Sequence, residues 1–232
     1  MEIYIVTEGD NVDQIAARYG EDVQQLIYDN QLEYPYRLAV GQALVIREAG
    51  DMQETAEKRR IVTGGYAYPF ISQWVLEQTL PYLTELSIFS YGFTEEGELV
   101  QPFMDEGWMI QKAEEYQVIP ILTLTPLGED GRFNNMLISR MLDNQASQER
   151  LIWNLGRKIT EKGYGGINVD FEYILAEDRD RFTAFIDRLT RVMNVFGYRV
   201  SVALAPKPSA DQRGLLYEGV DYRGLGEAAN EV

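Results

Sequence analysis

From residue 59 onward, short hydrophobic segments with strand character alternate with longer amphipathic segments with helix character. The strand-like segments are 60–68, 86–93, 118–127, 165–174 and 199–206. The helix-like segments are 72–83, 105–117, 134–144, 147–162, 177–197 and, more weakly, 222–230. This alternation is typical of a parallel sheet covered by helices. The sequence therefore predicts an α/β fold, either a barrel or a doubly wound sheet.

The first part of the chain has a different pattern. A strand-like start leads through a turn into a helix-like segment at 12–19, a second short helix follows, and 43–46 is again strand-like. This order predicts a small βααβ domain over residues 1–48. Residues 49–58 are polar and lack periodicity, so they are expected to form a linker to a second domain at 59–232.

Composition excludes several function classes. The chain has 37 acidic and 21 basic residues, a net charge of −16, no histidine and no cysteine. It is a poor candidate for binding nucleic acid, because phosphate neutralisation needs clustered Lys and Arg. Disulfides, thiolate or imidazole catalysis and Cys- or His-ligated metals are impossible, so acid–base chemistry must use carboxylates, Tyr or Lys.

Segments that would place the chain in or across a membrane are not apparent. No run of about 18 apolar residues is present, so no membrane span is expected. The N-terminus has neither the basic region nor the apolar region of a classical signal peptide. No nucleotide-binding glycine motif follows any predicted strand, and no cofactor is expected.

The segment 165–174 reads GGINVDFEYI and is unusual for a buried strand. Side chains alternate along a strand, so Asn168, Asp170 and Glu172 share one face and hydrophobic residues occupy the other. In a β/α barrel the polar face would point inward and rise toward the C-terminal mouth, where active sites lie. Neighbours on one face are roughly 6.5 to 7 Å apart at the backbone. Mutual repulsion should raise one carboxyl pKa, leaving a neutral acid able to donate a proton.

A structural role is the alternative for these carboxylates. They could form buried ion pairs that hold the fold together. The segment offers no Lys or Arg on the same face, and burying an unpaired acid is costly. A functional role is therefore favoured for Asp170 and Glu172.

The N-terminal domain resembles a known carbohydrate-binding module. The matching residues are YIVTEGDNVDQIAARYGEDVQQLIYDNQL and LAVGQALVI, which together resemble the LysM family. LysM modules bind N-acetylglucosamine polymers, peptidoglycan or chitin, in a shallow groove between two loops. The resemblance places six residues beside this groove: Gly9, Asp10, Asn11, Val12, Leu32 and Tyr34. The alternative for Gly9 and Asp10 is a purely structural role in a turn and helix cap.

The second domain resembles glycoside hydrolase family 18. GGINVDFE is similar to the family signature Asp-Gly-x-Asp-x-Asp-x-Glu, and VTGGYAY, SIFSYGF and SVALAPK are similar to its first, second and fifth strands. The resemblance implies a (β/α)8 TIM-type barrel with the signature on the fourth strand. Glu172 matches the catalytic acid and Asp170 the preceding carboxylate. Gly165 and Asn168 replace the first two Asp residues, and Asn168 is expected to alter the electrostatic coupling to Asp170.

The family resemblance implies a retaining, substrate-assisted mechanism, which is an exception to the usual two-carboxylate scheme. Glu172 would protonate the glycosidic oxygen and later activate water. The substrate's own acetamido oxygen would attack C1, and Asp170 would orient and stabilise that group. Tyr66 and Tyr91 near strand ends could stack on sugars, although packing in the core is the favoured alternative for both.

Taken together, the LysM module, the missing signal peptide and SVALAPK resemble the spore-germination type of this family. Such enzymes are N-acetylglucosaminidases that act on spore-cortex peptidoglycan, which implies a spore-associated or cell-wall-associated protein. Chitin oligosaccharides are the main alternative substrate, because both polymers contain β-1,4-linked N-acetylglucosamine.

The predicted second domain is short for a complete barrel, which usually needs roughly 200 residues or more. Five strands are counted, and the chain stops where a sixth would begin. A barrel truncated after about five β/α units is expected. Either the chain is part of a longer hydrolase, or it is a noncatalytic, LysM-tethered peptidoglycan-binding or spore-coat protein.

Overall fold

The computed structural model describes residues 2–47 and 61–232, so the linker predicted at 49–58 lies outside the described residues. The chain divides into two compact units, Met1–Arg60 and Ile61–Val232. Each has its own hydrophobic core.

The small unit has the predicted βααβ order. Its elements are β1 (Glu2–Ile5), α1 (Val12–Tyr19), α2 (Val23–Asp29) and β2 (Ala43–Ile46). β1 and β2 pair antiparallel. The Asn11 side chain caps α1 by accepting from Gln14 N at 2.9 Å, and Gly20 ends the helix with φ 67°, a conformation that glycine adopts without steric cost. The helices bury Ile15 and Leu26 against the two strands.

The large unit is built on five parallel strands that pair in chain order. They are β3 (Gly64–Ala67), β4 (Glu85–Phe93), β6 (Ile119–Leu124), β7 (Gly166–Val169) and β8 (Arg199–Val202). A short strand that the sequence did not predict, β5 (Leu99–Val100), pairs antiparallel with the end of β4. The order never reverses, which is typical of a TIM-like wall and not of a doubly wound sheet. Among the described residues, β3 and β8 do not pair with each other.

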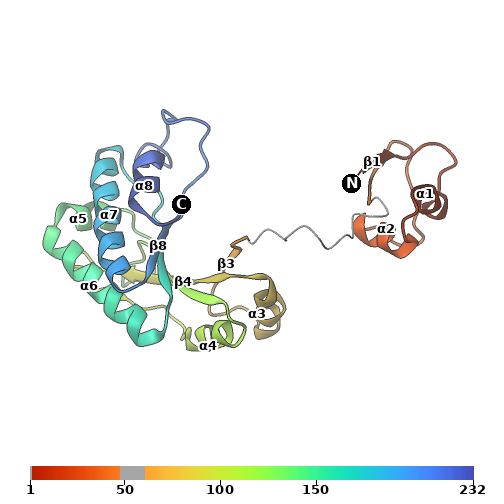
Figure 1. Cartoon of the computed structure of the whole chain (residues 1–232). Coiled ribbons are helices and arrows are strands. Elements are labelled where there is room, and N and C mark those ends of the chain that lie inside the picture. The colour runs from red at the N-terminus through yellow and green to blue at the C-terminus, as the bar shows by residue number, and fades with distance from the viewer. Residues whose placement is uncertain (1, 48–60) are drawn as a thin grey trace. The chain divides into compact units, whose positions relative to one another are not determined.

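Helices connect the parallel strands, as the alternating pattern predicted. They are α3 (Gln73–Thr79), α4 (Gly107–Glu115), α5 (Met136–Asp143), α6 (Gln145–Lys162), α7 (Arg179–Val195) and α8 (Tyr222–Ala228), with 3-10 turns η1 (Leu80–Tyr82) and η2 (Ala176–Asp178). The long helices α6 and α7 lie side by side (Figure 1). No helix within 2–47 and 61–232 is long and apolar enough to span a membrane.

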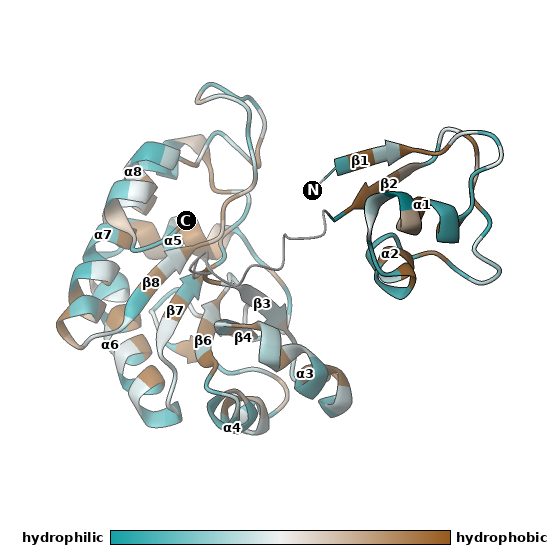
Figure 2. Ribbon diagram, turned by 45° about the vertical axis from the view of Figure 1, so that its right-hand side comes forward, coloured by the Kyte–Doolittle hydropathy of each residue, from teal (hydrophilic) through white to brown (hydrophobic). Residues whose placement is uncertain are grey.

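The core of the large unit lies between the sheet and these helices. Along β7, Ile167 and Val169 are buried, and Phe171 just beyond the strand packs its ring 5.8 Å from that of Phe182 on α7. Figure 2 shows β6 in hydrophobic colour and α7 with both hydrophilic and hydrophobic residues, as expected of a buried strand and an amphipathic helix. The hydrophobic face of β7 is thus used for packing, and its polar face is left for the site.

Candidate active site at the carboxyl ends of the strands

Asp170 and Glu172 lie at the edge of the sheet where the parallel strands end. The backbone N–H of Asp170 donates to Leu124 O at 2.9 Å, which continues the pairing between β7 and β6 past Val169. Asp170 is half-buried, while Glu172, two residues further along, is exposed. In β/α folds this edge is where the residues of active sites are found.

Both carboxylates line a cavity of about 350 Å³ on the β6 side of β7. Four aromatic residues contribute to its walls: Tyr68, Phe89, Phe133 and Tyr173. Thr125 and Asn135 add polar groups. A cavity of this size with aromatic walls and a few polar groups is typical of a small-ligand site. We call it the aromatic cavity.

Stacked aromatic rings continue outward from the aromatic cavity. The ring centroids of Tyr68 and Phe89 are 4.9 Å apart. The ring of Phe70 stacks on that of Tyr68, with a centroid distance of 5.0 Å. Phe70 itself is 70% exposed. The rings therefore form an apolar surface that leads from solvent to the carboxylates.

A second hollow of about 370 Å³ lies on the β8 side of the same carboxylates. Its other walls come from Phe171, from residues 203–206, which follow β8, and from Leu216 and Val220. We call it the aliphatic hollow. Asp170 and Glu172 thus stand between two spaces of similar size.

Asn168 precedes Asp170 by two residues on the polar face of β7. Its side-chain oxygen accepts a hydrogen bond from the Tyr66 hydroxyl at 3.0 Å, and its amide nitrogen donates to Ser201 Oγ at 2.9 Å. Asn168 is 5% exposed, so both bonds replace contacts with water. The amide therefore joins β3, β7 and β8 and has a fixed orientation.

The electrostatic environment favours a neutral Asp170. Burial raises the pKa of Asp170 above its usual range, and the negative charge of Glu172 raises it further. Burial also raises the pKa of Tyr66, as does the charge of Asp170, while its hydrogen bond to Asn168 acts in the opposite direction. The raised pKa therefore belongs to Asp170, the more buried acid, whereas the sequence assigned the role of neutral proton donor to Glu172.

The alternative of a structural ion pair has no support in the contacts. Among the residues that the structure describes, no Lys or Arg forms an ion pair with Asp170 or Glu172. Over the same residues, no cluster of three or more acidic side chains is arranged to hold a metal ion.

Tyr91, a candidate sugar contact, packs in the core instead, which is the alternative that the sequence favoured for it. Tyr91 is fully buried, and its hydroxyl donates to Glu106 Oε1 at 2.6 Å in the core. The register of β4 shifts between Ile88 and Tyr91, which interrupts the alternation of side chains along this strand. Phe89 reaches the aromatic cavity instead. Tyr66 is 54% exposed, and its hydroxyl bonds to Asn168.

Sequence reasoning missed most of the aromatic cavity. Tyr68 comes directly after β3, Tyr173 directly after Glu172, and Phe133 and Asn135 from the connection between β6 and α5. These residues lie in loops without a periodic pattern. The available signal was their position just beyond strand ends, which parallel strands bring to one edge.

In the small unit, most of the residues predicted beside a groove have structural roles. Gly9 has φ +90°, Asp10 accepts from the Tyr4 hydroxyl at 2.6 Å, Asn11 caps α1 and Val12 is 5% exposed in the core. The hydrogen bond from Tyr4 is the largest of the contacts that lower the pKa of Asp10.

The other two predicted residues lie near the α2 end of the small unit. Leu32 lines an open hollow of about 730 Å³ together with Ile27, Tyr28 and Glu33. Tyr34 is 84% exposed. Of the six residues predicted beside a groove, Leu32 lines this hollow, and Gly9–Val12 and Tyr34 do not.

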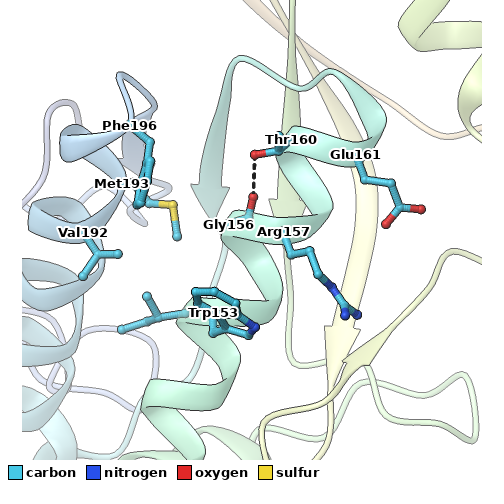
Figure 3. A pocket seen from close by; sticks show the side chains of 9 residues that line it. Trp153, Gly156, Arg157, Thr160, Glu161, Val192, Met193 and Phe196 are labelled. Carbon is cyan, nitrogen blue, oxygen red and sulfur yellow. Dashed lines mark hydrogen bonds between the residues drawn. The ribbon is translucent and has the colours of Figure 1, made fainter.

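A further hollow of about 420 Å³ lies between α6 and α7 (Figure 3). Its walls are almost entirely apolar and include Trp153, Met193 and Phe196, while the hydroxyl of Thr160 is used within α6, donating to Gly156 O at 2.8 Å. Neither Asp170 nor Glu172 lines it. The hollow between α6 and α7 is therefore separate from the site that contains Asp170 and Glu172.

Comparisons with known proteins support a relation to enzymes of glycan breakdown. Residues 4–47 match the LysM domain family. The chain is 26% identical to the cortical fragment-lytic enzyme of Bacillus subtilis (strain 168) in an alignment 280 positions long, which covers 100% of this chain and 64% of that protein. The chain thus spans less than two thirds of this relative.

Solved structures give a similar picture. The crystal structure of the Bacillus cereus spore cortex-lytic enzyme SleL matches with a TM-score of 0.71 and 27% identity, covering 98% of this chain and 52% of that one. A class V chitinase from Pseudomonas fluorescens Pf-5 matches with a TM-score of 0.65 and 26% identity, covering 71% of this chain and 51% of that one. This chain therefore joins a LysM domain to a unit that is homologous to spore cortex-lytic enzymes and chitinase-like in structure, which confirms the predicted resemblance to the glycosidases of family 18.

Proposed function

We propose that this chain is the LysM-bearing part of a glycoside hydrolase that cleaves β-1,4-linked N-acetylglucosamine glycans, with spore-cortex peptidoglycan as substrate. The observation that carries the proposal is that Asp170 and Glu172 line the same aromatic cavity. The names of the relatives, a cortical fragment-lytic enzyme and a spore cortex-lytic enzyme, support this choice over chitin. The proposed place of action is the spore or the cell wall.

In the proposed mechanism Glu172 is the general acid. Its exposed side chain borders both hollows, so it can reach a glycosidic oxygen that crosses from one to the other. Proton transfer to that oxygen breaks the bond to C1, while the acetamido oxygen of the sugar itself bonds to C1. Glu172, now ionised, then removes a proton from the water that opens this intermediate.

Asp170 is proposed to position the acetamido group. The carboxylate can accept a hydrogen bond from the acetamido N–H and take up its proton as positive charge develops on that group, and burial, by raising the pKa of Asp170, makes it a stronger base for this step. Asn168 is proposed to keep the strand that carries Asp170 in place, because both ends of its amide are bonded to neighbouring strands. No step requires a metal or an organic cofactor.

The aromatic cavity is proposed to hold the sugar ring. Pyranose rings have faces of C–H groups that pack on aromatic rings, and Tyr68, Phe89, Phe133 and Tyr173 supply such rings beside the acids. The closed (β/α)8 barrel of related enzymes is part of this proposal, and the five strands of this unit would form its first part.

The LysM domain supports a second candidate function, wall binding without turnover. Residues 2–47 have their own core and match the LysM family over 4–47, so they are suited to tether the chain to peptidoglycan or chitin. In this alternative the acid pair would play no part in breaking bonds.

Turnover on purified glycans separates the two candidates. The chain is incubated with peptidoglycan strands and, in parallel, with chitin oligosaccharides, and new reducing ends are measured over time. Release of reducing ends from peptidoglycan, faster than from chitin, is expected. Cosedimentation with both polymers without any release would leave only the wall-binding function.

A further inference from the structure

Glu172 lies on a short exposed segment between two buried hydrophobic side chains. Before it, Phe171 is 3% exposed, and its ring centroid lies 5.4 Å from that of Phe93. After the exposed segment, Ile174 is 2% exposed. Tyr173, between the acid and Ile174, has φ 56°, a left-handed conformation that residues other than glycine rarely adopt. The position of the Glu172 side chain therefore depends on the contacts that hold these two buried neighbours in place.

The buried neighbour on the far side of Glu172 is held by a turn at residues 214–220. A Cβ atom on Gly219 would lie 2.1 Å from Ile174 O and 2.8 Å from Ile174 Cβ. The turn and the acid-bearing segment thus touch at Gly219, and a larger residue there would force one of them to move. Because Ile174 is two residues beyond Glu172, a shift of the turn would reach the acid directly.

Lys207 joins this turn to the segment that follows β8. Its Nζ donates to Val220 O at 2.6 Å and to Tyr217 O at 3.4 Å, and it lies 4.9 Å from the centre of the Tyr222 ring. Among the residues that the structure describes, no carboxylate forms an ion pair with Lys207. Hydrogen bonds from a charged donor are stronger than those between neutral groups, so this partly buried ammonium holds the turn in place.

We propose that Lys207 is a positioning residue for Glu172, acting through the 214–220 turn. The inference rests on the proposed function and adds a residue that lines neither the aromatic cavity nor the aliphatic hollow. A general acid must lie within hydrogen-bond reach of the oxygen that it protonates, and a displacement of about 1 Å can cost about 10²-fold in rate. Lys207 therefore acts on proton transfer to the leaving group.

The first measurement follows the acid-bearing segment and requires no turnover. The full chain is labelled at the δ1 methyl groups of Ile for NMR, as the wild type, as Lys207→Met and as Lys158→Met. Lys158 is a matched control, a partly buried lysine on α6 that pairs with Glu161. The Ile174 signal should move in Lys207→Met alone, while that of Ile167 on β7 should stay in place in both variants. The two signals are assigned from Ile174→Val and Ile167→Val.

The second measurement separates a displaced acid from a loss of folded protein. Values of kcat/KM are compared on peptidoglycan strands, whose sugar leaving group needs a proton, and on 4-nitrophenyl N,N′-diacetylchitobioside, whose nitrophenolate leaves with little help from an acid. Lys207→Met should lower the value on peptidoglycan about 10-fold or more and the value on the nitrophenyl glycoside much less. A smaller fraction of folded protein would lower both values alike. Lys207→Arg keeps a charged donor and should recover part of the loss.

Gly219→Ala tests the same contacts from the other side of the turn. Its added Cβ atom would overlap with Ile174 O, so this variant should also lose more activity on peptidoglycan than on the nitrophenyl glycoside. Gly226→Ala, on α8, is the matched control, because a Cβ atom there meets nothing within 4 Å. It should leave the values on both substrates close to those of the wild type.

The outcomes distinguish a wrong positioning role from a wrong function. An Ile174 signal that stays in place in Lys207→Met would overturn the positioning role, and so would equal losses on the two substrates. In either case, cleavage of peptidoglycan by the wild type leaves the proposed function standing. If the wild type cleaves neither substrate, the proposed function fails, and the positioning role fails with it.

Discussion

Asp170 and Glu172 are separated by one residue, but their surroundings differ. Asp170 is half-buried, while Glu172 is exposed between the aromatic cavity and the aliphatic hollow. Two acids of the same chemistry can take different roles when their surroundings differ. In the proposed mechanism, the half-buried Asp170 positions the acetamido group of the substrate. The exposed Glu172 exchanges protons with the glycosidic oxygen and with water.

The raised pKa of Asp170 predicts a pH-dependent stability difference between the wild type and Asp170→Asn. Because the folded state holds the proton more tightly than the unfolded state, the wild type loses stability as pH rises from the ordinary Asp range through the raised pKa. The variant lacks this loss, so its stability relative to the wild type should increase with pH over that window. Urea unfolding at a series of pH values measures this difference.

The second cause of the shift gives the control for this prediction. In a Glu172→Gln background one negative charge is removed, so the gain from Asp170→Asn should become smaller. A stability difference that does not change with pH, or that falls as pH rises, would contradict the assigned environment of Asp170.

At the level of single residues, the sequence predicted the acids better than the aromatic side chains. Alternation along one strand was enough to put Asn168 and Asp170 on the polar face, because hydrophobic neighbours define the opposite face. Tyr91 could not be placed in the same way, because a register shift inside β4 reverses the alternation beyond Ile88. Such a shift depends on pairing with β6, which no local pattern reports.

At the level of elements, long periodic segments were predicted well and short ones were not. The hydrophobic residues of α7 recur at helical spacing, and Phe182, Phe185 and Leu189 are buried as this spacing predicts. β5 was missed because its two residues carry no pattern and pair only through contact with the end of β4. The strand at 165–174 was predicted too long, since regular pairing of β7 ends at Val169 and the chain turns away with the acids.

Gly92 illustrates why the end of β4 could not be read from the sequence. A Cβ atom there would lie 1.9 Å from Leu127 O, so the strand and the loop after β6 touch through their backbones. The sequence shows the glycine, but it does not show that Gly92 meets Leu127, which is 35 positions further along the chain.

At the scale of the whole molecule, the chain holds two separate cores, one in each compact unit. All three tryptophans, Trp74, Trp108 and Trp153, lie in the large unit, so their fluorescence reports the unfolding of that unit alone. The sequence predicted this division from a change of pattern, while the linker range it predicted lies outside the described residues.

Core substitutions in the two units should therefore give different signals. Ile15→Ala opens a cavity in the small core and should destabilise that unit by about 2–5 kcal/mol, seen as an earlier change in far-UV circular dichroism, with the tryptophan midpoint unchanged. Leu155→Ala, the matched change in the large core, should lower the tryptophan midpoint instead. A tryptophan midpoint that shifts with Ile15→Ala would show that the two cores do not unfold separately.

The proposed function depends on Glu172 acting as the acid beside a bound glycan. The most direct measurement is the rate of reducing-end release from peptidoglycan strands by the wild type, by Glu172→Gln and by Glu177→Gln, which changes an exposed acid on η2. Glu172→Gln should lower the rate by about 10²- to 10⁴-fold, the usual contribution of a general acid, while Glu177→Gln stays close to the wild type. Equal rates for Glu172→Gln and the wild type would contradict the assignment of the acid and, with it, the proposed mechanism.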